Sequence, residues 1–191
     1  MPIALQNLEW MSLNIFLACL GLIFGLLWVY FKNFYLKLFF LVLWILFLPN
    51  TIYLVTDLQH FNKQFFASRS FAEQIVLYLQ YIFLFTFGIF SYLFGMYPLN
   101  KLFPVFRKRE NPLLIPAAIV LNFAIAFGVT MGKIERTHSF YLFTQPGRVL
   151  QDIVDVFTFL PTLGFTILFA VLCNMIFFSF YAISVKMLKL K

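Results

Sequence analysis

The apolar positions of this chain gather into five long stretches that are separated by short polar segments. A helix needs about 20 apolar residues to cross a hydrocarbon core about 30 Å thick, and each stretch reaches that length. The runs are unbroken, whereas the strands of an outer-membrane barrel alternate apolar and polar residues over about 10 positions. The pattern therefore predicts an all-α, polytopic membrane protein, a single domain over residues 1–191 built as a bundle of spans at about 11–31, 38–58, 75–97, 113–132 and 158–185.

The segment before the last span, residues 148–157, has a different period. On a helix its apolar and polar side chains separate onto two sides, which is typical of a helix that lies in the membrane interface. We expect a short interfacial helix or a re-entrant lid on the outer membrane surface. The two sides are Val149, Ile153 and Val156 against Gln151, Asp152 and Asp155.

Composition supports a membrane location. Hydrophobic residues make up 63% of the chain, aromatic residues 21% and charged residues 11%. A water-soluble domain could not cover this much apolar surface, but a lipid bilayer solvates it. The connecting segments are too short to hold a separate catalytic domain, and no phosphate-binding glycine loop or nucleophile elbow is present, so we expect no cofactor.

The net charge of +7 is distributed unevenly between the two ends of the predicted spans. With the N-terminus outside, nine basic residues fall on the inner side and five on the outer side. Because basic residues collect on the cytoplasmic side, this predicts an outer N-terminus and a cytoplasmic C-terminus. The basic segment 101–109 then contacts anionic lipid head groups, an interpretation that we favour over binding of nucleic acid.

Polar residues interrupt the second span in one sector of its helix. At 100° per residue, Asn50, Tyr53, Asp57 and His60 fall on one face, just after Pro49, which is expected to kink the helix and free a backbone carbonyl. Ionisable groups within a span are costly and are tolerated only against protein or water. This face is therefore the first candidate for a functional site.

The fourth span carries cations that could meet this face. If its helix continues through residue 136, Lys133 and Arg136 lie within about 60° of Asn122, at the same outer membrane end as Asp57. An ion pair from Asp57 to either cation could simply fix helix register. The alternative is a functional polar site, which the variety of groups in the second span favours.

Two short motifs also permit a metal site. Asp57-x-x-His60 and Glu135-x-x-His138 each place a carboxylate and an imidazole one helical turn apart, as in metal sites at the core of helix bundles. Motifs of this length arise readily by chance, and His138 could equally remain exposed. We therefore keep these four residues as secondary candidates for metal binding.

Residues 44–60, together with residues 132–140, resemble the signature of a bacterial membrane protein family, domain-of-unknown-function family 1361. The resemblance implies a bacterial cytoplasmic membrane protein and names no activity. In the second block His138 stands where the family has asparagine, which weakens the metal interpretation and supports a site of Asp57 with cations. The matching positions are Pro49, Asn50, Tyr53, Thr56, Asp57, His60, Gly132, Arg136 and Ser139, and the other departures are Lys133 and Phe140.

Three classes of function remain open. The first is binding or transport of an anionic ligand, such as a lipid head group, or of a proton. The second is an outer-leaflet enzyme that uses Asp57 and His60, and the third is an accessory subunit whose polar residues only hold helices together. The ligand-binding candidates are Asn50, Tyr53, Thr56, Asp57, His60, Lys133, Arg136 and Ser139.

Other features concern packing and assembly. Gly21 and Gly25 form a small-xxx-small pattern that could join the first span to another helix or to a second copy in a homodimer, and a partner in a membrane complex is also open. Four polar residues within the spans are expected to hydrogen-bond between helices: Gln80, Thr86, Asn122 and Asn174.

Overall fold

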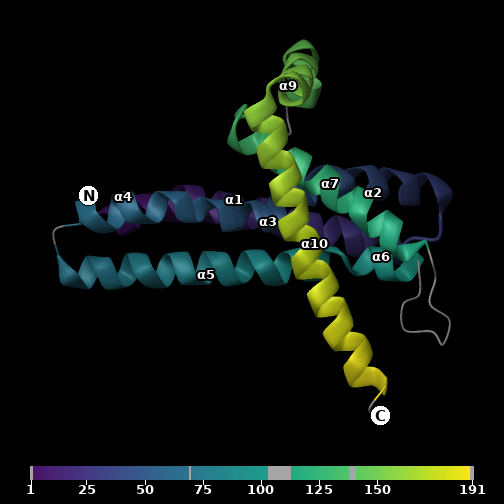
Figure 1. Ribbon diagram of the computed structural model, residues 1–191, viewed down its shortest axis with the longest axis horizontal. Helices are drawn as coiled ribbons and strands as arrows, with labels where there is room; N and C mark the ends of the chain where they lie inside the picture. The colour runs from purple at the N-terminus through teal and green to yellow at the C-terminus, as the bar shows by residue number, and fades with distance from the viewer. Residues whose placement is uncertain (1, 69, 103–112, 138–140, 190–191) are drawn as a thin grey trace. The chain divides into compact units, whose positions relative to one another are not determined.

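The computed structural model describes residues 2–68, 70–102, 113–137 and 141–189, which are helical with short connections (Figure 1). Within this part of the chain, five helices are long and apolar enough to cross a membrane. The protein is an all-α, polytopic membrane protein, as the hydrophobic pattern predicts. These spans are Ile3–Tyr30, Phe34–Ala67, Phe71–Leu99, Leu114–Lys133 and Leu160–Ser184.

The first two spans extend beyond the predicted limits at the end that carries polar residues. The first begins at Ile3 rather than near residue 11, and the second continues to Ala67 rather than ending near residue 58. Both extensions contain polar side chains that satisfy one another, such as Asn7 and Gln64. Polar residues lower the hydropathy of a segment whether or not they are hydrogen-bonded to each other. Hydropathy therefore places these two extensions outside the spans.

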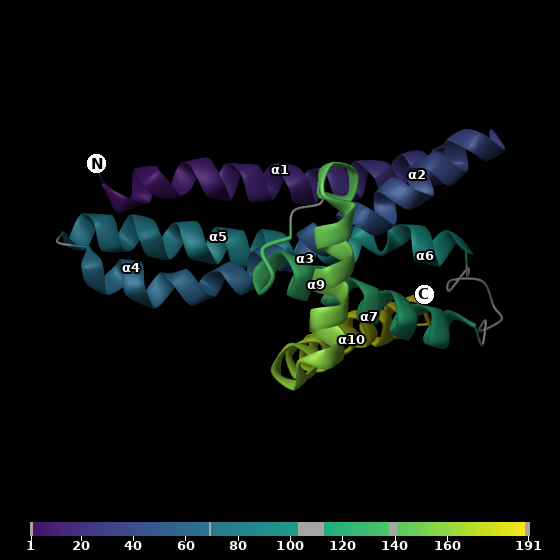
Figure 2. The same ribbon diagram turned by 90° about the horizontal axis from the view of Figure 1, so that it is seen from above.

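The chain divides into two compact units, Met1–Pro98 and Leu99–Lys191, and each is described by itself. In the first unit, helix α1 packs against α2, α3 and α5, and both views show α5 running alongside the α3–α4 segment (Figures 1 and 2). The elements are α1 (Ile3–Tyr30), α2 (Phe34–Phe47), α3 (Pro49–Thr56), the 3₁₀ helix η1 (Asp57–His60), α4 (Phe61–Ala67), α5 (Phe71–Gly95) and α6 (Tyr97–Leu102), the last of which crosses the boundary between the units.

The second span is broken between α2 and α3 by Pro49, which has no backbone N–H to donate. The Thr51 N–H bonds to the Leu48 carbonyl, and the Asn50 side-chain amide donates to the Phe47 carbonyl at 3.1 Å. The predicted break is therefore present. The Asn50 side chain thus gives the Phe47 carbonyl a hydrogen-bond donor. Within a membrane such a donor must come from the protein, because no water is present in the hydrocarbon core.

Small residues bring α1 close to α2. A Cβ atom added at Gly21 would lie 2.9 Å from the Phe47 carbonyl oxygen, and one at Gly25 would lie 2.8 Å from Cδ1 of Trp44. Beside them Trp28 stacks on Trp44 with ring centroids 5.6 Å apart. The small-xxx-small pattern thus packs two helices of the same chain, one of the two arrangements that the sequence left open.

The second unit contains α7 (Leu114–Lys133), α8 (Tyr141–Thr144), α9 (Pro146–Thr158) and α10 (Leu160–Lys189). Two polar contacts join α7 to α10 within their apolar interface. Asn122 Nδ2 donates to Asn174 Oδ1 at 3.0 Å, and the hydroxyls of Thr130 and Thr166 lie 2.7 Å apart. The predicted interhelical roles of Asn122 and Asn174 are confirmed, and these two residues pair with each other.

Helix α9 is the predicted short helix before the last span, but its faces differ from the prediction. Val149 and Val156 are buried as expected, and Asp152 is buried with them. An apolar stripe on the other side is exposed instead: Leu150, Val154 and Phe157. Helix α9 therefore presents apolar side chains on two sides, and its polar residue Asp152 is satisfied inside the unit.

Candidate functional site

Asp57 is the buried carboxylate of the second span, with 2% of its surface exposed. It begins the 3₁₀ helix η1, and the next three residues, Leu58, Gln59 and His60, are exposed. The side-chain amide of Asn14, on α1, donates to Asp57 Oδ2 at 2.9 Å. Tyr81, on α5, lies close enough to Asp57 to interact with it electrostatically.

A second polar cluster lies further toward the N-terminal end of α1. Asn7 and Gln64 exchange hydrogen bonds, with the Asn7 amide 2.6 Å from Gln64 Oε1 and the Gln64 amide 3.0 Å from Asn7 Oδ1. The Trp10 indole donates to Asn7 Oδ1, and the Tyr81 hydroxyl donates to Gln64 Oε1, each at 3.0 Å. The cluster thus joins α1, α4 and α5 through neutral groups.

These two clusters share one spacing. Asn7 and Asn14 are seven residues apart on α1, and Asp57 and Gln64 are seven apart on the second span. Because seven residues bring a helix back to nearly the same face, two antiparallel helices can pair both positions at once. Sequence reasoning missed Asn7, Asn14 and Gln64 as partners, and this matched spacing is the signal that could have found them.

The remaining candidates of the second span have local partners. The Thr56 hydroxyl donates to the Tyr53 carbonyl at 2.6 Å, and Tyr53 itself is half-buried. His60 is exposed, lies 3.1 Å from the Gln59 side chain and meets the Trp10 ring edge-on at 5.9 Å. The polar face of this span therefore contains one buried carboxylate, Asp57, and side chains such as Thr56 and His60 that contact neighbouring residues of the same span.

An apolar groove lies beside the polar face, between η1, α4 and α5. Its cavity volume is about 190 Å³. Tyr81, only 1% exposed, belongs both to this groove and to the cluster with Gln64. The lining residues are Leu58, Phe61, Tyr78, Tyr81, Ile82 and Phe85.

In the second unit, the cationic pair of the fourth span is not arranged as predicted. Helix α7 ends at Lys133, and Arg136 has a left-handed backbone with φ of 55°. The expectation that the helix continues through residue 136 is wrong, so Arg136 does not extend the face of Lys133. Ser139 and His138 lie outside the described residues.

Glu135 faces carboxylates rather than an imidazole among the described residues. Carboxylate oxygens of Glu135, Asp152 and Asp155 all lie within 4.8 Å of one another. Burial, and then the negative charges of the two aspartates, raise the pKa of the Glu135 carboxyl above its ordinary value. Such a group of oxygen atoms could hold a hard cation, or the three residues could share a proton.

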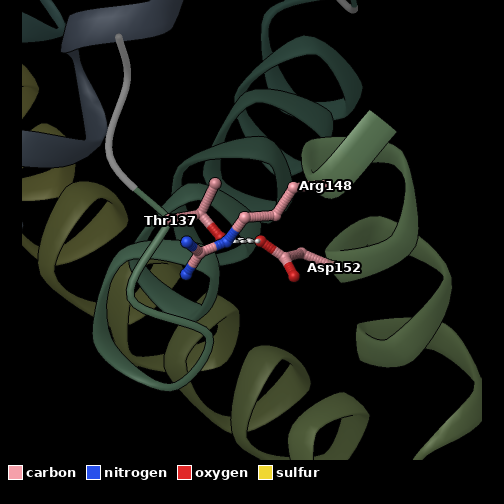
Figure 3. Close-up of polar contacts among 3 residues, drawn as sticks. All are labelled: Thr137, Arg148 and Asp152. Atoms are coloured by element: carbon pink, nitrogen blue, oxygen red, sulfur yellow. Dashed lines mark hydrogen bonds and ion pairs between the residues drawn. The ribbon is translucent and has the colours of Figure 1, made fainter. Parts of the chain in front are cut away.

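Cationic and hydroxyl groups balance one side of this acidic group (Figure 3). The Thr137 hydroxyl donates to Asp152, and Arg148 Nε lies 3.8 Å from Asp152 Oδ2. The Arg148 guanidinium also stacks over the ring of Tyr141 at 4.7 Å. Asp152 is therefore held by its own unit, and neither it nor Asp155 was among the sequence-predicted site residues.

The structure thus brings the candidates together in two separate groups. Asn50, Tyr53, Thr56, Asp57 and His60 lie in the first unit, and Lys133, Glu135 and Arg136 lie in the second. Comparison of the chain with curated proteins and with solved structures gives no match. A family described as "Protein of unknown function (DUF1361)" matches residues 13–176, which is most of the chain. This multi-pass membrane protein therefore belongs to the DUF1361 family.

Proposed function

We propose that this protein takes up and releases a proton at Asp57 as part of a transport step across the membrane. The observation that carries the proposal is a carboxylate that is 2% exposed among helices long enough to span a bilayer. A charged aspartate costs about 2.5–3.5 kcal/mol at the centre of a span on insertion scales and less toward its ends, so a buried aspartate within a span is a functional candidate by default.

The surroundings of Asp57 suit a group that changes its protonation state. Asn14 offers an amide, whose nitrogen donates to the ionised form and whose oxygen could accept from the protonated form after the amide turns. Asp57 is also only three residues from the exposed His60 within one short 3₁₀ helix. A proton therefore has a short distance to travel between the surface and the buried carboxylate.

Binding of an anionic ligand at Lys133 and Arg136 has less support. Glu135 lies between these two cations in the sequence, and its carboxylate gathers with those of Asp152 and Asp155, so the negative charge around Glu135 disfavours an anion there. An enzyme that uses Asp57 and His60 together also has less support, because the first side chain is buried and the second is exposed.

A structural role is the second candidate function, and the matched spacing favours it. The pairs Asn7 with Gln64 and Asn14 with Asp57 would fix the register of α1 against the second span even if Asp57 never changed its charge. Buried polar groups are known to specify register in this way. The two candidates differ in what Asp57→Asn should do.

The test compares wild-type protein with Asp57→Asn in liposomes. Asparagine can still pair with Asn14, so the variant should keep its thermal stability while it loses the protonation signal. We expect the infrared spectra of wild type and Asp57→Asn to differ by one titrating carboxylic acid C=O band, beyond the bands of the other six acidic side chains. Proton uptake into the liposomes, driven by a potassium diffusion potential, should fall to the level of empty liposomes.

Glu9→Gln provides the matched control, because Glu9 is an exposed carboxylate on the same end of α1. It should retain both the titrating band and the proton flux. If Asp57→Asn kept the flux and the titrating band, the proton proposal would be wrong. That result would instead indicate the structural role, because asparagine at position 57 keeps the pair with Asn14.

A further inference from the structure

We propose that the apolar groove between η1, α4 and α5 binds one acyl chain of a membrane phospholipid. This site is additional to Asp57, and it does not depend on the proton proposal. The floor of the groove is formed by the rings of Phe61 and Tyr81, whose centroids lie 5.4 Å apart. Its rim is formed by residues that are largely exposed: Leu58, Tyr78, Ile82 and Phe85.

The groove is continuous with the lipid-facing surface of α5. Ile75, Leu79 and Ile82 follow one another at helical spacing and are 45%, 59% and 47% exposed. This stripe lies on a helix that is long and apolar enough to cross a membrane, so we expect lipid chains to lie against it. Ile82 belongs to both the stripe and the rim, and a lipid chain lying along the stripe meets the groove directly.

The size of the groove favours a single chain over other occupants. Sites for compact organic ligands measure about 300–1,000 Å³, whereas this cavity measures about 190 Å³. A helix of a second copy is about 10–12 Å wide with its side chains and is too bulky for it. A linear hydrocarbon chain is narrow enough, and the rings in the floor give it close van der Waals contacts.

Occupation of the groove also bears on the polar interior. An acyl chain in the groove packs on the ring of Tyr81, whose hydroxyl donates to Gln64 at 3.0 Å. Because Gln64 in turn pairs with Asn7, a bound chain supports the contact between α1 and α4. Binding to the folded state alone raises the melting temperature, so a bound lipid has a measurable effect.

The test uses a phosphatidylglycerol that carries a photoreactive diazirine in one acyl chain, added to protein that has been stripped of lipid in detergent. We expect crosslinks to concentrate in the peptides around residues 58–61 and 78–85. Ile82→Trp fills the groove and should reduce this labelling to the level of the rest of the chain. Leu168→Trp is the matched control, since it adds the same side chain to an exposed position of α10 outside the stripe and the groove, and it should label as wild type does.

Melting temperature gives a second readout. Unlabelled dioleoyl phosphatidylglycerol should raise the melting temperature of wild type and of Leu168→Trp but not of Ile82→Trp. Phosphatidylcholine with the same chains should act equally, because the acyl chain is the recognised part. If Ile82→Trp fails to fold, Leu58→Phe fills the groove from the opposite rim.

Several outcomes would overturn the proposal. Labelling spread evenly along all spans, or labelling that survives in both filled variants, would show that the groove holds no chain. An effect confined to phosphatidylglycerol would assign recognition to the head group instead. Native mass spectrometry that finds a dimer in wild type and a monomer in Ile82→Trp would make a second copy the occupant.

Discussion

A buried carboxylate in a membrane span acquires its character from the residues that face it. The sequence was sufficient to single out Asp57, because an ionisable group in an apolar run is rare and costly. It did not reveal Asn14, the residue that donates to Asp57, because that contact depends on how two helices are aligned. The periodicity of one helix shows on which face a residue lies. It does not show which residue of a neighbouring helix packs against that face.

The same lesson applies to Glu135. The sequence paired it with His138 on an assumed helical turn, whereas helix α7 ends at Lys133 and the carboxylates of Asp152 and Asp155 approach it from α9. Three residues after the end of α7, Arg136 has a left-handed backbone conformation. Such a conformation is uncommon for a residue other than glycine, so helix propensity gave no warning of it.

Glu135→Gln should make the stability of the protein less dependent on pH. The raised pKa of Glu135 means that the folded state holds its proton more tightly than the unfolded state does. Its contribution is therefore fully present below about pH 4 and is lost as the pH rises through the raised value. Relative to wild type, Glu135→Gln should be more stable at neutral pH, by up to about 0.5 kcal/mol, and no more stable near pH 4.

Thermal melts in detergent across that pH range would measure the effect. In a chain that already carries Asp155→Asn, the gain from Glu135→Gln should be smaller, because one of the repelling charges has been removed. A gain of the same size at every pH would show that the ionisation of Glu135 is not its cause.

At the scale of elements, the sequence predicted the long helices and the irregularity at Pro49, but it did not predict the 3₁₀ helix η1. The break at Pro49 followed from proline chemistry, since the missing N–H interrupts any helix. The 3₁₀ winding of η1 was not predicted, and neither was the burial of Asp57 at its first residue beside the exposure of His60 at its last. The burial of Asp57 comes from contacts with α1 and α5, which the periodicity of one span does not contain.

Gly25→Ala should destabilise the contact between α1 and α2. The added Cβ would lie 2.8 Å from Cδ1 of Trp44 and 2.9 Å from Cγ of Pro98, and neither ring can move without disturbing its own contacts. Overpacking of this kind costs about 1–3 kcal/mol. Gly164→Ala is the control, since nothing lies within 4 Å of its added Cβ, and it should be neutral or slightly stabilising.

Unfolding of both variants in mixed detergent would provide the comparison. Equal stability of Gly25→Ala and Gly164→Ala would mean that α1 and α2 separate more easily than their close packing implies.

At the scale of the whole molecule, the sequence predicted an all-α membrane protein with five spans, and both points are confirmed. The predicted site spanned the second and fourth spans, and these lie in different compact units of the structure. Contacts between parts of a chain that are distant in sequence leave no periodic trace, so this portion of the site stays a prediction.

The predicted orientation has a direct test in the first unit. Lys32 lies in the short connection between α1 and α2, and Lys63 lies on α4 at the other end of the second span, and both are exposed. In intact cells, a membrane-impermeant maleimide should label Lys63→Cys and not Lys32→Cys, with Cys19 and Cys173 replaced by alanine in both. The opposite labelling pattern would mean that the N-terminus is cytoplasmic.

The matched spacing of the two polar pairs has a mechanical consequence. A slide of α1 along the second span by one helical turn, about 5.4 Å, would break both Asn7 with Gln64 and Asn14 with Asp57 at once. Because both pairs break together, they jointly oppose a small slide of α1 along the second span. We therefore expect a movement that opens Asp57 to water to be a rotation or a bend of α1 rather than a slide.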